Sequence, residues 1–85
     1  MWFFNEKETM PEPPVYRHQV KIYHPDSTWI AVYLPDTDGV LEVLQRFAQW
    51  YEGGSDSKVL AHGDVAIGVT RAYIKAYTVT KVEFD

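Results

Sequence analysis

The chain has no cysteine, and this absence excludes several kinds of chemistry at once. It rules out disulfide cross-links, thiolate nucleophiles, thiol redox chemistry and cysteine-based zinc sites. A chain without disulfides is typical of the cytosol, so we expect a cytoplasmic protein. We expect no cofactor, because the only glycine pair, Gly53-Gly54, follows a predicted helix, whereas a phosphate-binding loop opens one.

Long hydrophobic segments are also missing. The apolar residues Trp2, Phe3 and Phe4 are followed directly by the polar residues 5–8. This run is too short for the core of a signal peptide or for a membrane span. We therefore expect neither export by a signal peptide nor insertion into a membrane.

The sequence has no excess of positive charge. Its twelve acidic residues outnumber its eight basic residues, which gives a formal net charge of -4. A protein with this balance has no overall field that would attract nucleic acid or an anionic membrane. A nucleic-acid partner is therefore disfavoured, and any anion would have to bind at a local site.

What the chain does have is enough apolar material for one small domain. Hydrophobic residues make up 46% of its 85 residues and aromatic residues 15%, unlike the composition of disordered chains. Residues 1–14 form an apolar tag followed by a linker with three prolines close together, which disfavour a helix or a central strand. We predict a single domain over residues 15–85.

Two alternating segments predict an antiparallel hairpin at the start of this domain. Residues 15–24 and 28–34 each alternate apolar and polar or aromatic side chains, and the turn residues His24-Pro25-Asp26-Ser27 separate them. The predicted core side of the hairpin consists of Tyr16, His18, Val20, Ile22, Ile30, Val32 and Leu34.

A helix is predicted over residues 38–52, with Asp38 at its N-terminus and Gly53-Gly54 at its end. Its apolar residues recur at the helical spacing and would face the core: Val40, Val43, Leu44, Phe47, Trp50 and Tyr51.

The remaining residues predict further strands. Residues 58–61 and 65–69 indicate a small hairpin or a bent edge strand around His62-Gly63-Asp64. Residues 73–84 are the longest strand candidate, and a change in their alternation predicts a bulge near Thr78. The fold class is therefore a small α+β domain of order ββαββ(β), in which one amphipathic helix packs on one face of an antiparallel sheet of about 4–5 strands.

One face of this sheet is predicted to be aromatic and basic. If the helix covers the side that carries Val20, Ile22 and Val32, the other side presents side chains that are common at interfaces. The predicted binding residues are Arg17, Lys21, Tyr23, Trp29, Tyr33, Tyr73, Lys75, Tyr77 and Lys81. Because a large patch of this kind usually marks an interaction surface, we expect a protein partner or a homo-oligomer such as a dimer.

Other interpretations of this face stay open. Residues 2–4 could fold back across it, or the last strands could curl the sheet into a partial barrel. Aromatic and basic side chains together could also bind single-stranded nucleic acid. As a further alternative, the protein could mimic a polyanion and inhibit a nucleic-acid-binding protein, using Glu6, Glu8, Glu12, Asp36, Asp38, Glu42 and Glu52.

Signals for catalysis are weak, and we expect no enzyme. His18, His24 and His62 could in principle share a metal ion, but their spacing matches no helical zinc motif. The sequence His62-Gly63-Asp64 has the look of a turn, and no serine lies in a nucleophile elbow. His18, on the core side of its strand, is most simply a hydrogen-bonded core residue.

Overall fold

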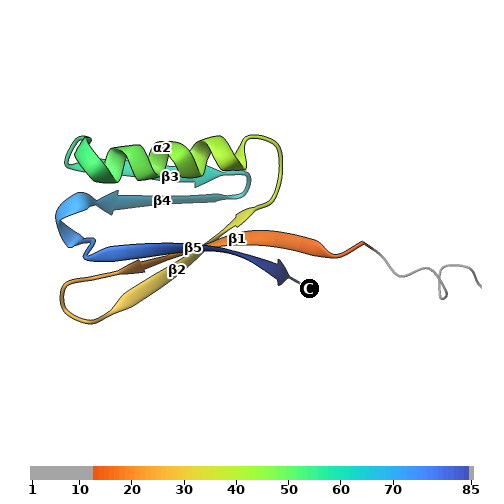
Figure 1. Cartoon of the computed structure of the whole chain (residues 1–85), viewed down its shortest axis with the longest axis horizontal. Helices are drawn as coiled ribbons and strands as arrows, with labels where there is room; N and C mark the ends of the chain where they lie inside the picture. Colours follow the sequence, from red (N-terminus) through yellow and green to blue (C-terminus); the bar gives the residue numbers. More distant parts are fainter. Residues whose placement is uncertain (1–12, 85) are drawn as a thin grey trace, which may run out of the picture.

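The computed structural model describes residues 13–84, which form five strands in two antiparallel sheets and one α-helix (Figure 1). The predicted α+β class, with the helix packed on a sheet, is confirmed. The elements in chain order are β1 (Val15–Tyr23), β2 (Trp29–Pro35), α2 (Val40–Gly53), β3 (Ser57–His62), β4 (Val65–Thr70), the 3-10 turn η1 (Arg71–Tyr73) and β5 (Ala76–Phe84).

The larger sheet has the order β2-β1-β5, so β1 lies at its centre. Val20 of β1 lies opposite Val32 of β2 on one side and opposite Val79 of β5 on the other. The turn between β1 and β2 is closed by Asp26, whose carboxylate accepts hydrogen bonds from the main chain and the hydroxyl of Thr28. The predicted first hairpin is thus present.

The helix α2 begins two residues later than predicted. Gly39 occupies the N-cap position with a φ of 90°, and no side chain caps the helix there. Glycine adopts this left-handed backbone at low cost, so the helix starts after Gly39 rather than at Asp38. At the other end, the N–H of Gly54 donates to Trp50 O at 2.7 Å, which agrees with the predicted glycine stop.

The second sheet is the hairpin β3–β4, and the hairpin alternative predicted for this segment is confirmed. Its two-residue turn is Gly63-Asp64, where Gly63 has a φ of 60°. A Cβ atom at this position would approach Pro35 Cγ to 2.5 Å. Glycine is therefore required both by the turn and by the close approach of β2.

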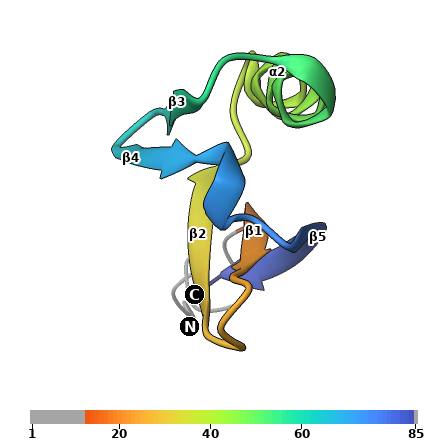
Figure 2. The same cartoon turned by 90° about the vertical axis from the view of Figure 1, so that its left-hand side faces the viewer.

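The helix and the β3–β4 hairpin cover the same face of the larger sheet, as the end-on view in Figure 2 shows. Phe47 has no exposed surface, and its ring centroid lies 5.0 Å from that of Tyr77 in β5 and 5.5 Å from that of Trp50. The buried apolar residues of all these elements form one cluster: Val20, Ile22, Val32, Leu34, Val40, Phe47, Trp50, Leu60, Val69 and Ile74.

Strand β5 keeps one register with β1 along its whole length, from Phe84 opposite Val15 to Ala76 opposite Tyr23. The predicted bulge near Thr78 is therefore wrong. The extra residue comes earlier, because the N–H of Lys75 also donates to Tyr23 O at 2.7 Å. This irregularity changes the phase of alternation before β5 starts.

The predicted tag with Trp2, Phe3 and Phe4, and most of the linker, lie outside the described residues. Among the residues described, no helix has both the length and the apolar character needed to cross a membrane.

Candidate interaction surface

The face of the larger sheet that points away from α2 is called the outer face here. Because side chains alternate along a strand, it is formed by the odd-numbered residues of β1 and β2 and the even-numbered residues of β5. Five of the predicted binding residues lie on it: Arg17, Lys21, Tyr23, Trp29 and Tyr33. The β5 contribution is Ala76, Thr78, Thr80, Val82 and Phe84.

Four predicted binding residues lie elsewhere. Tyr77 faces the helix and contacts the rings of Phe47 and Tyr51, so its placement on the outer face is wrong. Lys81 shares this side, where its Nζ lies 3.2 Å from Asp36. The cause is the extra residue before β5, which reverses the face that each β5 side chain occupies.

The other two of these four residues are not in a strand. Tyr73 belongs to η1 and is 68% exposed, and Lys75 lies in the connection to β5.

The position of Tyr77 under the helix changes its acidity. Burial, the nearby charge of Glu52 and the neighbouring Tyr51 raise the pKa of Tyr77.

One end of the outer face is a stack of a cation on two aromatic rings. Tyr23 and Trp29 are cross-strand partners beside the β1–β2 turn. The Nζ atom of Lys21 lies 4.1 Å from the ring centroid of Trp29 and 5.5 Å from that of Tyr23. Trp29 is still 52% exposed, so this end offers a large aromatic surface with a positive charge beside it.

The other end centres on Phe84, which the sequence reasoning missed. The ring centroids of Phe84 and Tyr33 are 5.4 Å apart, and the guanidinium carbon of Arg17 lies 5.5 Å from the Phe84 ring centroid. Gln19 Nε2 donates to the Tyr33 hydroxyl at 3.0 Å. Phe84 lies an even number of residues after Ala76 and therefore on the same face of β5. The correct alternation of β5 would have identified it as an outer-face residue.

Arg17 also connects the outer face to the β3–β4 turn. Its Nη1 atom lies 3.2 Å from both Tyr33 O and Asp64 Oδ1. The hydrogen bond from Arg17 is the largest cause that lowers the pKa of the Asp64 carboxyl. Beside this pair lies an open depression of about 440 Å³, lined by Arg17, Ala31, Val32, Tyr33, Asp64, Val65, Ala66, Ile67 and Phe84.

On the helix side of the sheet, a polar cluster lies at the ends of β1, β2 and β5. His18 is buried, and its Nε2 donates to the Asp36 carboxylate at 2.9 Å, which confirms the prediction of a hydrogen-bonded core histidine. Lys81 contacts the second carboxylate oxygen. The hydrogen bond from His18 and then that from Lys81 lower the pKa of Asp36.

The three histidines have three different partners. His18 bonds Asp36, His62 bonds Thr37 at 2.8 Å, and His24 Nδ1 lies 2.9 Å from the Thr28 hydroxyl. Within residues 13–84, no three His, Asp or Glu side chains are grouped so that they could hold a metal ion.

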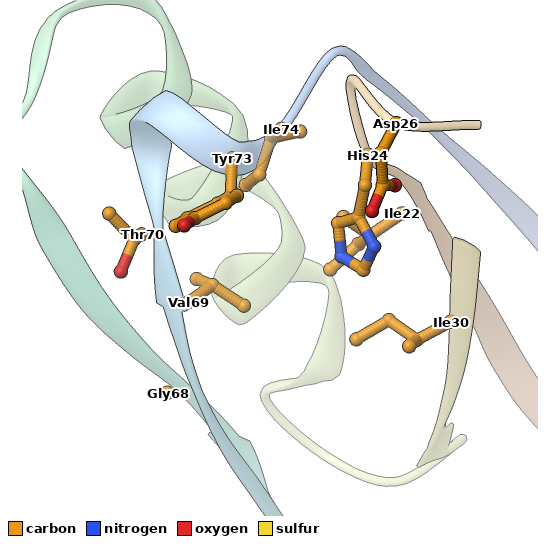
Figure 3. A pocket seen from close by; sticks show the side chains of 9 residues that line it. All are labelled: Ile22, His24, Asp26, Ile30, Gly68, Val69, Thr70, Tyr73 and Ile74. Carbon is orange, nitrogen blue, oxygen red and sulfur yellow. The ribbon is translucent and has the colours of Figure 1, made fainter. Parts of the chain in front are cut away.

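A pocket of about 350 Å³ lies between the β1–β2 turn and the end of β4 (Figure 3). His24 and Asp26 stand on one wall, and Val69, Thr70 and Tyr73 stand on the other. The Thr28 hydroxyl donates its only hydrogen to Asp26 at 2.6 Å, so His24 Nδ1 must be the donor to Thr28. The Thr28 hydroxyl thus accepts a hydrogen bond from His24 and is not activated by it as a nucleophile, and the other ring nitrogen of His24 has no hydrogen-bond partner within residues 13–84.

Comparison of the chain with family models, with curated proteins and with solved structures found no match.

Proposed function

We propose that this protein acts without catalysis, as a small interaction protein that binds a protein partner through its outer face. The observation that supports this proposal most strongly is that the other elements pack on one face of the larger sheet. The helix and the β3–β4 hairpin both pack on one face of the larger sheet, and no described element packs across the other, which the β3–β4 turn contacts at Arg17. An antiparallel sheet with one free face commonly uses that face for contact with solvent or a partner.

Charge indicates which kind of protein would fit. The strands contribute Arg17 and Lys21 to the outer face, but the turn residue Asp64 pairs with Arg17, so Lys21 is the outer-face cation that forms no ion pair among the described residues. The chain as a whole is acidic, with a formal net charge of -4. We propose that the partner carries an acidic group opposite Lys21 and apolar side chains that pack on Trp29 at one end of the face and on Phe84 at the other.

The polyanion-mimic hypothesis draws less support. Asp36 is already paired with His18 and Lys81, and Glu42 lies 3.5 Å from Arg46, which is one turn further along the helix. Carboxylates that are neutralised within the chain contribute little to an external negative field.

The test uses a photo-cross-linking phenylalanine analogue in place of Tyr33, which lies on the outer face beside Phe84. A discrete protein adduct is expected in cells, and it should be lost when Trp29→Ala and Lys21→Glu are added. The matched control places the same analogue at Leu41, which is 70% exposed on the helix. An adduct of twice the chain mass would identify another copy as the partner.

Two results would contradict the proposal. One is an equal adduct from positions 33 and 41, which would indicate non-specific contact. The other is tight binding of a thymidine oligonucleotide at low salt that falls steeply as salt rises, because that dependence is the mark of a nucleic-acid site.

A further inference from the structure

Within residues 13–84, strand β5 has a strand neighbour on one edge alone, and the main-chain hydrogen-bonding groups of its other edge can be assigned from the register. In an antiparallel pair, the groups of successive residues point alternately to the two neighbouring strands. Asp36 N–H donates to Tyr16 O, so even-numbered residues of β1 bond β2. Odd-numbered residues of β1 therefore bond β5, in agreement with the bond from Lys75 N–H to Tyr23 O.

This assignment identifies which β5 residues are unpaired in the described part of the chain. The odd-numbered β1 residues lie opposite the even-numbered residues of β5, for example Gln19 opposite Thr80 and Lys21 opposite Thr78. The odd-numbered β5 residues consequently direct their N–H and C=O groups away from the sheet: Tyr77, Val79, Lys81 and Glu83. Figure 2 shows β5 at the border of the sheet, and β1 is its one strand neighbour among residues 13–84.

The edge of β5 lacks most of the usual features that protect an edge strand, and Glu83 is the charged edge residue that forms no ion pair in the described part of the chain. Residues 76–84 contain no proline or glycine, their register has no bulge, and most of their side chains are exposed. Charged side chains often blunt such an edge. Here Lys81 is held instead by Asp36 and lies 4.9 Å from the ring centroid of Tyr16. The opposite edge, β2, ends in a proline and contacts the β3–β4 hairpin.

We propose that β5 pairs antiparallel with β5 of a second copy, with the two-fold axis at Thr80, to form a continuous six-stranded sheet. In this register Tyr77 lies opposite Glu83 of the second copy, and Val79 lies opposite its Lys81. All four residues with unpaired groups then bond one another, and no like charges lie directly opposite. A shift of the axis to Val82 would leave Tyr77 and Val79 without partners among residues 76–84.

A pair of strands buries less surface than a standard stable interface of about 1,200–2,000 Å². The dimer is therefore expected to dissociate on dilution. It uses the edge of the sheet and leaves both outer faces free and side by side, so it does not depend on the function proposed above.

The first experiment uses proline, which lacks an N–H group. Val79→Pro removes a hydrogen that points out of the sheet, and edge strands tolerate proline at such positions. Sedimentation velocity over about a hundredfold range of concentration should show a monomer–dimer equilibrium for the parent and a monomer for Val79→Pro. Val79→Lys, which keeps the N–H group but adds a charge at the edge, is the second variant if the proline variant does not fold.

The second experiment uses single cysteines, which are unambiguous because the chain has none. At the axis, the two Thr80 residues form a non-hydrogen-bonded pair with Cα atoms about 4.5 Å apart, within the range for a disulfide. Under mild oxidation Thr80→Cys should cross-link much faster than Thr78→Cys or Val82→Cys. The last two place each cysteine roughly 13 Å along the strand from its copy.

Three results would overturn the proposal. The parent could remain a monomer at every concentration, or Val79→Pro and Val79→Lys could both dimerise as the parent does. Alternatively, Val82→Cys could cross-link faster than Thr80→Cys, which would indicate a different register. None of these readouts depends on the outer-face partner, so failure here is distinct from failure of the proposed function.

Discussion

At the scale of single residues, Asp36 links two strands of the larger sheet through its carboxylate. It follows β2, and its carboxylate joins His18 of the central strand to Lys81 of β5. Its pKa is lowered from 3.8, mainly by the hydrogen bond from His18. A carboxyl whose pKa is lower in the folded state stabilises the fold above its unfolded pKa, and this contribution is lost as the pH falls through the folded pKa.

We therefore predict that Asp36→Asn is less stable than the parent near neutral pH, and that this difference shrinks below about pH 4. Urea unfolding at several pH values measures it through the midpoint. Asp38→Asn is the control, since Asp38 is exposed in the same loop and makes neither of these contacts. If the stability difference between the parent and Asp36→Asn stayed the same from neutral to acidic pH, protonation of the Asp36 carboxyl would not be linked to folding.

At the scale of elements, α2 depends on a narrow buried stripe. Phe47 lies wholly inside the core between Trp50 and Tyr77, whereas Gln45 on the other side of the helix is exposed. We predict that Phe47→Ala lowers the free energy of unfolding by about 3–5 kcal/mol. Gln45→Ala should change it by less than about 0.5 kcal/mol.

Chemical denaturation followed by circular dichroism gives both values. If Phe47→Ala does not fold, Phe47→Leu provides a smaller loss that can be compared with Gln45→Ala. Equal losses for the buried and the exposed position would mean that the helix packs through a different face.

The helix and the first hairpin were predictable because their periodicity is local. The buried positions Val20, Ile22, Val32 and Phe47 all follow from alternation or from the helical spacing. The start of the helix was missed because Gly39 takes a left-handed backbone, which composition alone does not reveal.

The candidate surface was predictable only where the strands are regular. Arg17, Lys21, Tyr23, Trp29 and Tyr33 lie together as expected from β1 and β2. The β5 residues were assigned to the wrong face because one extra residue at Lys75 reverses every later side chain. Tertiary pairing with β1 decides where that residue is accommodated, and no local pattern encodes it.

At the scale of the whole molecule, one core joins the two sheets. Leu60 of β3 has no exposed surface and belongs to the same cluster as Val20 and Phe47. A small domain with one core is expected to unfold in a single transition. The β3–β4 hairpin should therefore not melt separately from the β2-β1-β5 sheet.

We predict that Leu60→Ala lowers stability by about 2–5 kcal/mol and shifts the midpoints from circular dichroism and tryptophan fluorescence together. Val59→Ala is the matched control, since Val59 is the neighbouring residue and is 64% exposed. Midpoints that separate in Leu60→Ala would mean that the hairpin is an independent cooperative unit.

The central position of β1 has a consequence for how the chain reaches its native state. Strand β1, the first described strand, pairs with β2, which follows it closely in the sequence. Its other neighbour, β5, is the last described strand. Closing so long a loop costs entropy before any of its contacts form, and such non-local pairing slows folding. Until β5 arrives, β1 itself is a bare edge, so newly made chains pass through a stage at which aggregation competes with completion of the sheet.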